Sequence, residues 1–126
     1  MSIRVHSHQQ LFAWLKRESV PHAVLRYFDE NDDDIDLLVE DEAIPFLITQ
    51  LGVRRGLKVD LYGVAGVHGD YHGHPHLPKS LGHRILSNPR HRNGLQVPQL
   101  QDEYLALLYH LAYHKPSQSG IAFEKP

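Results

Sequence analysis

The sequence predicts a single α/β or α+β domain with a small mixed sheet flanked by helices. Segments of alternating apolar and polar residues, typical of strands, are separated by segments with apolar residues at helical spacing. The chain has 126 residues, which is enough for one hydrophobic core. It contains no cysteine, which excludes disulfides and thiolate metal sites. No apolar run approaches the roughly 20 residues of a membrane-spanning helix.

The N-terminal third is predicted to form a helix followed by a hairpin. Ser7 is a suitable N-cap for a helix through residue 18, because its side chain can accept from a first-turn amide. Residues 22–28 (HAVLRYF) and 34–39 (DIDLLV) are predicted to be strands. The polar run at 29–33 (DENDD) between them is typical of a turn, so we expect an antiparallel hairpin.

The middle of the chain is predicted to contain a helix, a strand and a long loop. Residues 41–51 place apolar side chains at i, i+3, i+4 and i+7, and Gly52 follows where a helix ends. Residues 57–62 (LKVDLY) alternate cleanly between apolar and polar, which predicts a strand. Residues 63–81 are rich in Gly, His and Pro, and a loop of this length in a compact domain is often functional.

The C-terminal part is predicted to form a short strand at 84–86, a polar connection at 88–98 and a helix at 100–114. The apolar residues assigned to the buried face of this helix are Tyr104, Leu107, Leu108 and Leu111. The last residues, from 115 onward, lack periodicity and are expected at the surface. Because the ending SGIAFEKP follows directly after a helix, we expect the natural chain to continue.

The formal charge of −2 is unevenly distributed. Residues 1–42 contain 4 Lys/Arg and 10 Asp/Glu, a net charge of −6, and residues 43–126 contain 9 and 5, a net charge of +4. Nine of the fifteen carboxylates lie at positions 29–42. Such crowding is self-repelling unless solvent, a cation or a basic partner compensates it.

Three aspartates on the predicted strands form a candidate metal site. Asp34 and Asp36 lie at alternate positions, so they share a face of one strand at about 6 to 7 Å. Asp60, on the next predicted strand, can join them. Carboxylates suit Mg²⁺, and paired ions can hold the attacking and leaving oxygens of a phosphoryl transfer. Aspartate is depleted in strands, which favours a site, although a solvated sheet face is the alternative interpretation.

The order of a strand, DIDLLV, a helix and KVDLYG resembles the nucleotidyltransferase fold of the DNA polymerase β-like superfamily, in particular its minimal single-domain members. The resemblance covers residues 22–63. Residues 25–39 (LRYFDENDDDIDLLV) are similar to a pattern in nucleotidyltransferase-like proteins linked to bacterial surface-polysaccharide synthesis. The resemblance implies a Mg²⁺-dependent nucleotidyl or phosphoryl transfer with ATP or another nucleoside triphosphate as substrate. Asp34, Asp36 and Asp60 would be the metal ligands and catalytic residues, with Asp60 orienting or deprotonating an acceptor hydroxyl.

The sequence departs from that family at the turn after the first strand. Active members carry a Gly-Ser pair there, whose amides and hydroxyl hold the triphosphate, and no such pair stands between Phe28 and Asp34. The basic residues assigned to phosphate contacts instead are Arg26, Lys58, Lys79 and Arg84. An alternative function is therefore a degenerate nucleotidyltransferase-fold module that binds or regulates within a larger polysaccharide-assembly protein.

A histidine-rich loop gives a third hypothesis, a transition-metal binder. Its alternating histidines are His68, His72, His74 and His76. Neutral imidazoles in an extended loop can converge on Zn²⁺ or Ni²⁺. The alternative is a polar loop that binds metal weakly, because the spacing matches neither a helical pair nor a zinc finger.

Composition also limits the partners. With a pI near 6.6 and no interleaved aromatic platform, nucleic acid is an unlikely partner. No membrane partner is expected. The first ten residues lack the apolar block of a secretory signal, so we expect a cytoplasmic protein. The expected partners are a nucleotide or phosphorylated small molecule, together with other domains or subunits.

Overall fold

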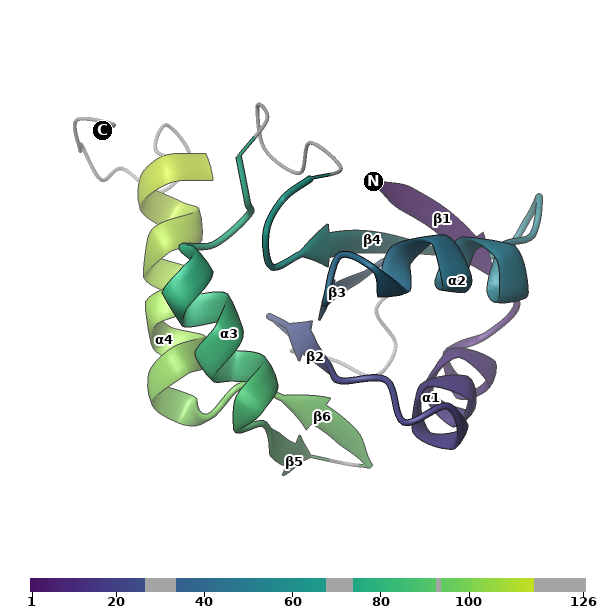
Figure 1. The fold of residues 1–126 in the computed structure, drawn as a ribbon, viewed down its shortest axis with the longest axis horizontal. Coiled ribbons are helices and arrows are strands. Elements are labelled where there is room, and N and C mark those ends of the chain that lie inside the picture. Colours follow the sequence, from purple (N-terminus) through teal and green to yellow (C-terminus); the bar gives the residue numbers. More distant parts are fainter. Residues whose placement is uncertain (27–33, 68–73, 93, 115–126) are drawn as a thin grey trace.

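The fold in the computed structural model is a mixed α and β domain (Figure 1). The structure describes residues 1–26, 34–67, 74–92 and 94–114. In chain order, the elements are β1 (Ser2–Val5), α1 (His8–Arg17), β2 (His22–Leu25), β3 (Asp34–Val39), α2 (Ala43–Leu51), β4 (Leu57–Gly63), α3 (Lys79–Ser87), β5 (Arg90–Arg92), β6 (Leu95–Val97), α4 (Leu100–Tyr109) and the π-helical turn η1 (His110–His114). No helix in these described ranges is both long and apolar enough to cross a membrane.

The larger sheet has four strands in the order β1-β4-β3-β2. β3 and β4 are parallel and are connected through α2, whereas β2 and β1 are antiparallel to their neighbours. The predicted β2-β3 hairpin is confirmed as an antiparallel pair, and its turn at 29–33 lies outside the described residues. β1 was not predicted, because it has only four residues and its pairing with β4 is not visible in local periodicity.

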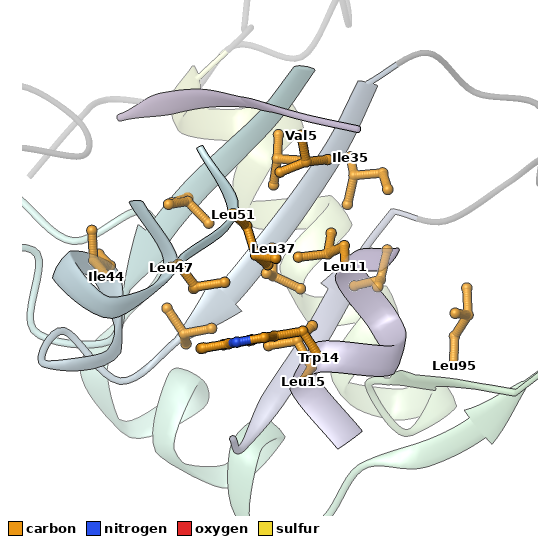
Figure 2. Packing of buried hydrophobic residues seen from close by; sticks show 14 of the residues in the cluster. Val5, Leu11, Trp14, Leu15, Ile35, Leu37, Ile44, Leu47, Leu51 and Leu95 are labelled. Atoms are coloured by element: carbon orange, nitrogen blue, oxygen red, sulfur yellow. The ribbon is translucent and has the colours of Figure 1, made fainter. Parts of the chain in front are cut away.

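One face of this sheet carries the main hydrophobic core, beneath α1 and α2. The alternation of β3 and β4 points Ile35, Leu37, Val59 and Leu61 to this side. Figure 2 shows Leu37 between Leu11 of α1 and Leu47 of α2. Ser7 caps α1 through a hydrogen bond from the Gln10 amide at 3.1 Å, as its sequence predicts. Helix α1, which carries Trp14 of the core, therefore begins directly after the predicted N-cap.

The opposite face is covered over only part of its area, by α3 and α4, which lie together on the left in Figure 1. Leu81 and Ile85 of α3 pack there against Leu38 of β3 and Ala23 of β2. The start of β3 on the same face is exposed. Because α3 and α4 cover only part of this face, the predicted aspartates lie beside the hydrophobic cluster under these two helices and are not covered by it.

Three predictions for residues 63–98 are wrong. Residues 84–86 lie in helix α3, not in a strand, because Leu81 and Ile85 are spaced one helical turn apart and both face the core. The loop was predicted to reach residue 81, but it ends before Lys79, where α3 begins. The connection at 88–98 contains the antiparallel β5-β6 pair, which lies beside β2.

The final helix has the predicted extent but a different buried face. Tyr104 is 62% exposed and Leu108 is 39% exposed, whereas Asp102 and Ala106 are buried. Arg84 of α3 binds the Asp102 carboxylate at 2.7 Å. The ion pair and the small Ala106 side chain bring α4 close to α3, so Tyr104 and Leu108 remain at the surface, whereas Leu107 and Leu111 are half-buried.

Candidate functional site

The three predicted aspartates lie on the part of the sheet face that α3 and α4 leave uncovered. This surface is here called the aspartate face, and it consists of Ser2, Asp34, Asp36, Lys58 and Asp60. Strand register places Ser2, Asp60 and Asp36 in one row across β1, β4 and β3. Lys58 and Asp34 form the next row. Because neighbouring strands lie about 4.8 Å apart, side chains within a row are in reach of one another. The predicted convergence of Asp34 and Asp36 with Asp60 on one face is consistent with this register.

Asp36 is bound by Arg26, which follows β2. The Arg26 Nη2 atom donates to Asp36 Oδ2 at 2.8 Å, and the two side chains are only 10% and 24% exposed. Arg26 has a φ of 50°, in the left-handed region that non-glycine residues rarely adopt. This backbone conformation accompanies a side chain that lies against β3. A guanidinium therefore occupies a contact position that a metal ion would need at Asp36.

Tyr62 and His76 complete the surroundings of this ion pair. The Tyr62 hydroxyl donates to Asp36 Oδ1 at 3.2 Å. His76 stacks on the Tyr62 ring with centroids 3.9 Å apart, and its Nε2 lies 3.1 Å from Arg26 Nη1. Burial, followed by the nearby Asp36 charge, raises the pKa of Tyr62 well above its usual value. Tyr62 therefore keeps its proton and acts as a donor.

The ionised form of the Asp36 carboxyl is disfavoured despite these partners. Burial raises the pKa of Asp36 above its usual value, and the charge of Asp60 adds to the increase. Arg26 and the Tyr62 hydroxyl act in the opposite direction without outweighing burial. The ionised Asp36 side chain therefore depends on Arg26, and removing either partner would leave an uncompensated charge.

The other two aspartates differ in their surroundings. Asp60 accepts a hydrogen bond from the Ser2 hydroxyl, and the Lys58 ammonium lies 3.9 Å from its Oδ1 atom. Asp34 is exposed at the start of β3. Across the described part of the chain, no group of three or more His, Asp or Glu side chains is arranged to hold a metal ion. In this arrangement Arg26 supplies the positive charge beside Asp36, and Lys58 supplies it beside Asp60.

A cavity of about 550 Å³ adjoins the aspartate face at strand β1 and is here called the basic hollow. Its lining includes Ser2, Ile3, Arg4, Ile48, Arg54 and Lys58. Arg4 donates to the Gly56 carbonyl at 3.1 Å, and the Val53 amide donates to the Arg4 carbonyl at 2.9 Å. These contacts hold the loop that carries Arg54 against β1. Three cationic side chains from two strands and a loop therefore border one cavity.

Comparison with known proteins finds no matching family model, no matching curated protein and no matching solved structure. The basis for a proposed function is therefore the geometry of the described residues.

The remaining predicted site residues lie elsewhere or are engaged in other contacts. Lys79 is exposed in the first turn of α3, and the Arg84 guanidinium is held by Asp102. Of the loop histidines, His76 is buried against Tyr62 and His74 is exposed. His68 and His72 lie outside the described residues. Only Arg26 and Lys58 of the predicted phosphate-binding set are therefore at the aspartate face.

Asp41 is a structurally important carboxylate that the sequence did not reveal. Its side chain is buried and accepts hydrogen bonds from the amides of Ala65, at 2.6 Å, and Val67, at 2.9 Å. A Cβ atom at Gly63 would collide with the Asp41 carboxyl group. Asp41 therefore fixes the turn at the carboxyl ends of β3 and β4. Its position within an acidic run gave no local signal, because its partners are 24 and 26 residues away.

Proposed function

We propose that the domain binds a phosphorylated small molecule or nucleotide in the basic hollow without a metal ion. In this proposal it is a degenerate nucleotidyltransferase-like module that does not transfer the bound group. The observation that supports it most directly is the convergence of Arg4, Arg54 and Lys58 on one cavity. The neighbouring Asp36 is paired with Arg26, and Asp60 accepts a hydrogen bond from Ser2, which reduces the negative charge that would repel a phosphate.

The chemistry of the hollow suits this class of ligand. Guanidinium groups match the geometry of phosphate oxygens, and Lys58 adds a point charge. Ile3 and Ile48 offer an apolar surface for the remainder of the ligand. We further propose that the domain acts in the cytoplasm, where phosphorylated metabolites and nucleotides are abundant. It would act there beside other domains or subunits that perform the chemistry.

A second candidate function is the Mg²⁺-dependent transfer implied by the resemblance. It is favoured by the register of Asp36 with Asp60 and by Asp34 on the same face. This candidate requires Arg26 to release Asp36 and requires Asp34 as a ligand. Asp34 is therefore the residue that separates the two functions, because the proposed metal-free binding does not use it.

The proposal predicts that ATP binds in EDTA at least as tightly as in Mg²⁺, because Mg²⁺ chelates the phosphate oxygens that the cationic side chains contact, and that Arg54→Met weakens binding about tenfold. The loss is expected because Arg54 lines the hollow. Isothermal titration calorimetry with ATP and with pyrophosphate measures it.

Arg55→Met is the matched control, since the neighbouring Arg55 is exposed and does not line the described cavity. It removes the same charge from the same loop and should leave the ATP affinity unchanged. Equal losses in the two variants would attribute binding to general electrostatic attraction and would contradict a site in the hollow. Absence of ATP binding to the wild type would contradict it as well.

A further inference from the structure

A second cavity, of about 590 Å³, lies where the end of α1 meets β2 and the β5-β6 pair. It is here called the histidine cavity, and its polar lining includes Lys16, Ser19, His22, His91 and Gln96. Its volume falls within the range of small-molecule sites. None of the predicted aspartate or phosphate-binding residues is among the described residues that line it. It is therefore separate from the aspartate face and the basic hollow.

The charge of the histidine cavity points to an anion. Lys16 contributes an ammonium group, and His22 and His91 contribute imidazole rings whose nitrogens can donate to an anion. No carboxylate occurs among the described lining residues. The last carbonyl groups of α1 are also engaged, because the Ser19 amide donates to Lys16 O and the Val20 amide to Leu15 O. The helix end therefore leaves these acceptors unavailable to a bound cation.

His22 is held in a defined orientation at the cavity wall. Its Nδ1 atom lies 2.8 Å from the Val20 carbonyl, and because a carbonyl only accepts, Nδ1 carries the proton. The other ring nitrogen, Nε2, gains a proton when the ring becomes cationic. Burial lowers the pKa of His22, and the nearby His91 lowers it further. A bound anion would offset both effects, since it favours the protonated imidazole.

The apolar part of the lining favours an organic anion over an inorganic one. Phe12, Leu15, Val20 and Leu86 form a hydrophobic wall on which an inorganic ion would leave apolar surface uncovered. Ser19, with a φ of 53°, is the left-handed residue that ends α1, and this turn sets the rim of the cavity. We propose that the histidine cavity binds a small organic carboxylate, whose charge lies between Lys16, His22 and His91 and whose apolar part contacts this wall.

The test is an NMR titration with benzoate, benzamide and acetate, followed at the amides of Ser19, Gly94 and Gln96. Benzoate should cause saturable shifts there and bind about tenfold more tightly than benzamide, which lacks the charge, or acetate, which lacks the ring. Its affinity should increase as the pH falls toward the lowered pKa of His22, because protonation of this imidazole adds a positive charge beside the anion.

Lys16→Met and His91→Gln should each weaken benzoate binding about fivefold, because the first removes the ammonium group from the wall and the second removes the imidazole. Arg17→Met is the matched control, since Arg17 is exposed in the same helical turn, paired with Glu18, and absent from the described lining. Equal affinity for benzoate and benzamide, or no saturable shift at these amides, would overturn the inference. So would a loss of benzoate binding in Arg54→Met rather than Lys16→Met, which would place the anion in the basic hollow. ATP binding in the basic hollow should be unchanged in Lys16→Met, so the two proposals fail independently.

Discussion

Replacing Asp36 with alanine is expected to lower the free energy of unfolding by about 3 kcal/mol, near the lower end for breaking a buried ion pair. The reason is that Arg26, whose side chain is only 10% exposed, would lose its carboxylate partner at 2.8 Å. Residual solvent access to Asp36 keeps the effect from being larger. Urea denaturation followed by circular dichroism measures the change.

The matched control is Asp34→Ala, which removes a carboxylate from the same face of the same strand. Asp34 is exposed, so its replacement should change the free energy of unfolding by less than about 0.5 kcal/mol. The double variant Arg26→Met/Asp36→Leu should recover most of the lost stability, because it leaves no uncompensated charge. Equal destabilisation by the two single substitutions would contradict the ion pair as the source of the effect.

Replacing Asp41 with alanine is also expected to cost about 3 kcal/mol, because two hydrogen bonds to a charged group are lost and two amides lose their acceptor. The amides are those of Ala65 and Val67, which follow β4. Hydrogen exchange should show faster exchange at both amides, and thermal unfolding should show the loss of stability.

Glu42→Ala tests whether this effect belongs to Asp41 itself. Glu42 is adjacent in the sequence and exposed, so its loss should leave both amide exchange rates and the melting temperature nearly unchanged. If Asp41→Ala left the exchange of the Ala65 and Val67 amides at the wild-type rate, the turn would not depend on this carboxylate.

Local periodicity was sufficient to predict the elements that make up the larger part of the main core. The strand β3, the helix α2 and the strand β4 follow the alternation and the helical spacing of their apolar residues. Periodicity failed for β1 and the β5-β6 pair, which have only three or four residues each. It also assigned the wrong face of α4, because the Arg84–Asp102 ion pair buries a charged residue that a hydrophobic pattern places outside.

The candidate site was predictable to the extent that it depends on strand alternation. Alternation alone places Asp34 and Asp36 on one face, and Asp60 joins them through the parallel pairing of β3 with β4. The role of Arg26 was not predictable, because it depends on a left-handed backbone after β2. The basic hollow was not predictable either, because Arg4 reaches Lys58 only through the unpredicted strand β1.

We propose that this domain binds a phosphorylated ligand without metal, with protein cations supplying the positive charge. The most direct measurement is calorimetric titration of ATP into the wild type and Asp34→Ala, each in EDTA and in Mg²⁺. Metal-free binding predicts that the wild type and Asp34→Ala bind ATP in EDTA with affinities equal within about a factor of two, and that neither binds more tightly in Mg²⁺, which chelates the phosphate oxygens. Binding that requires Mg²⁺ and is lost in Asp34→Ala would contradict the claim and would support the metal-dependent transferase instead.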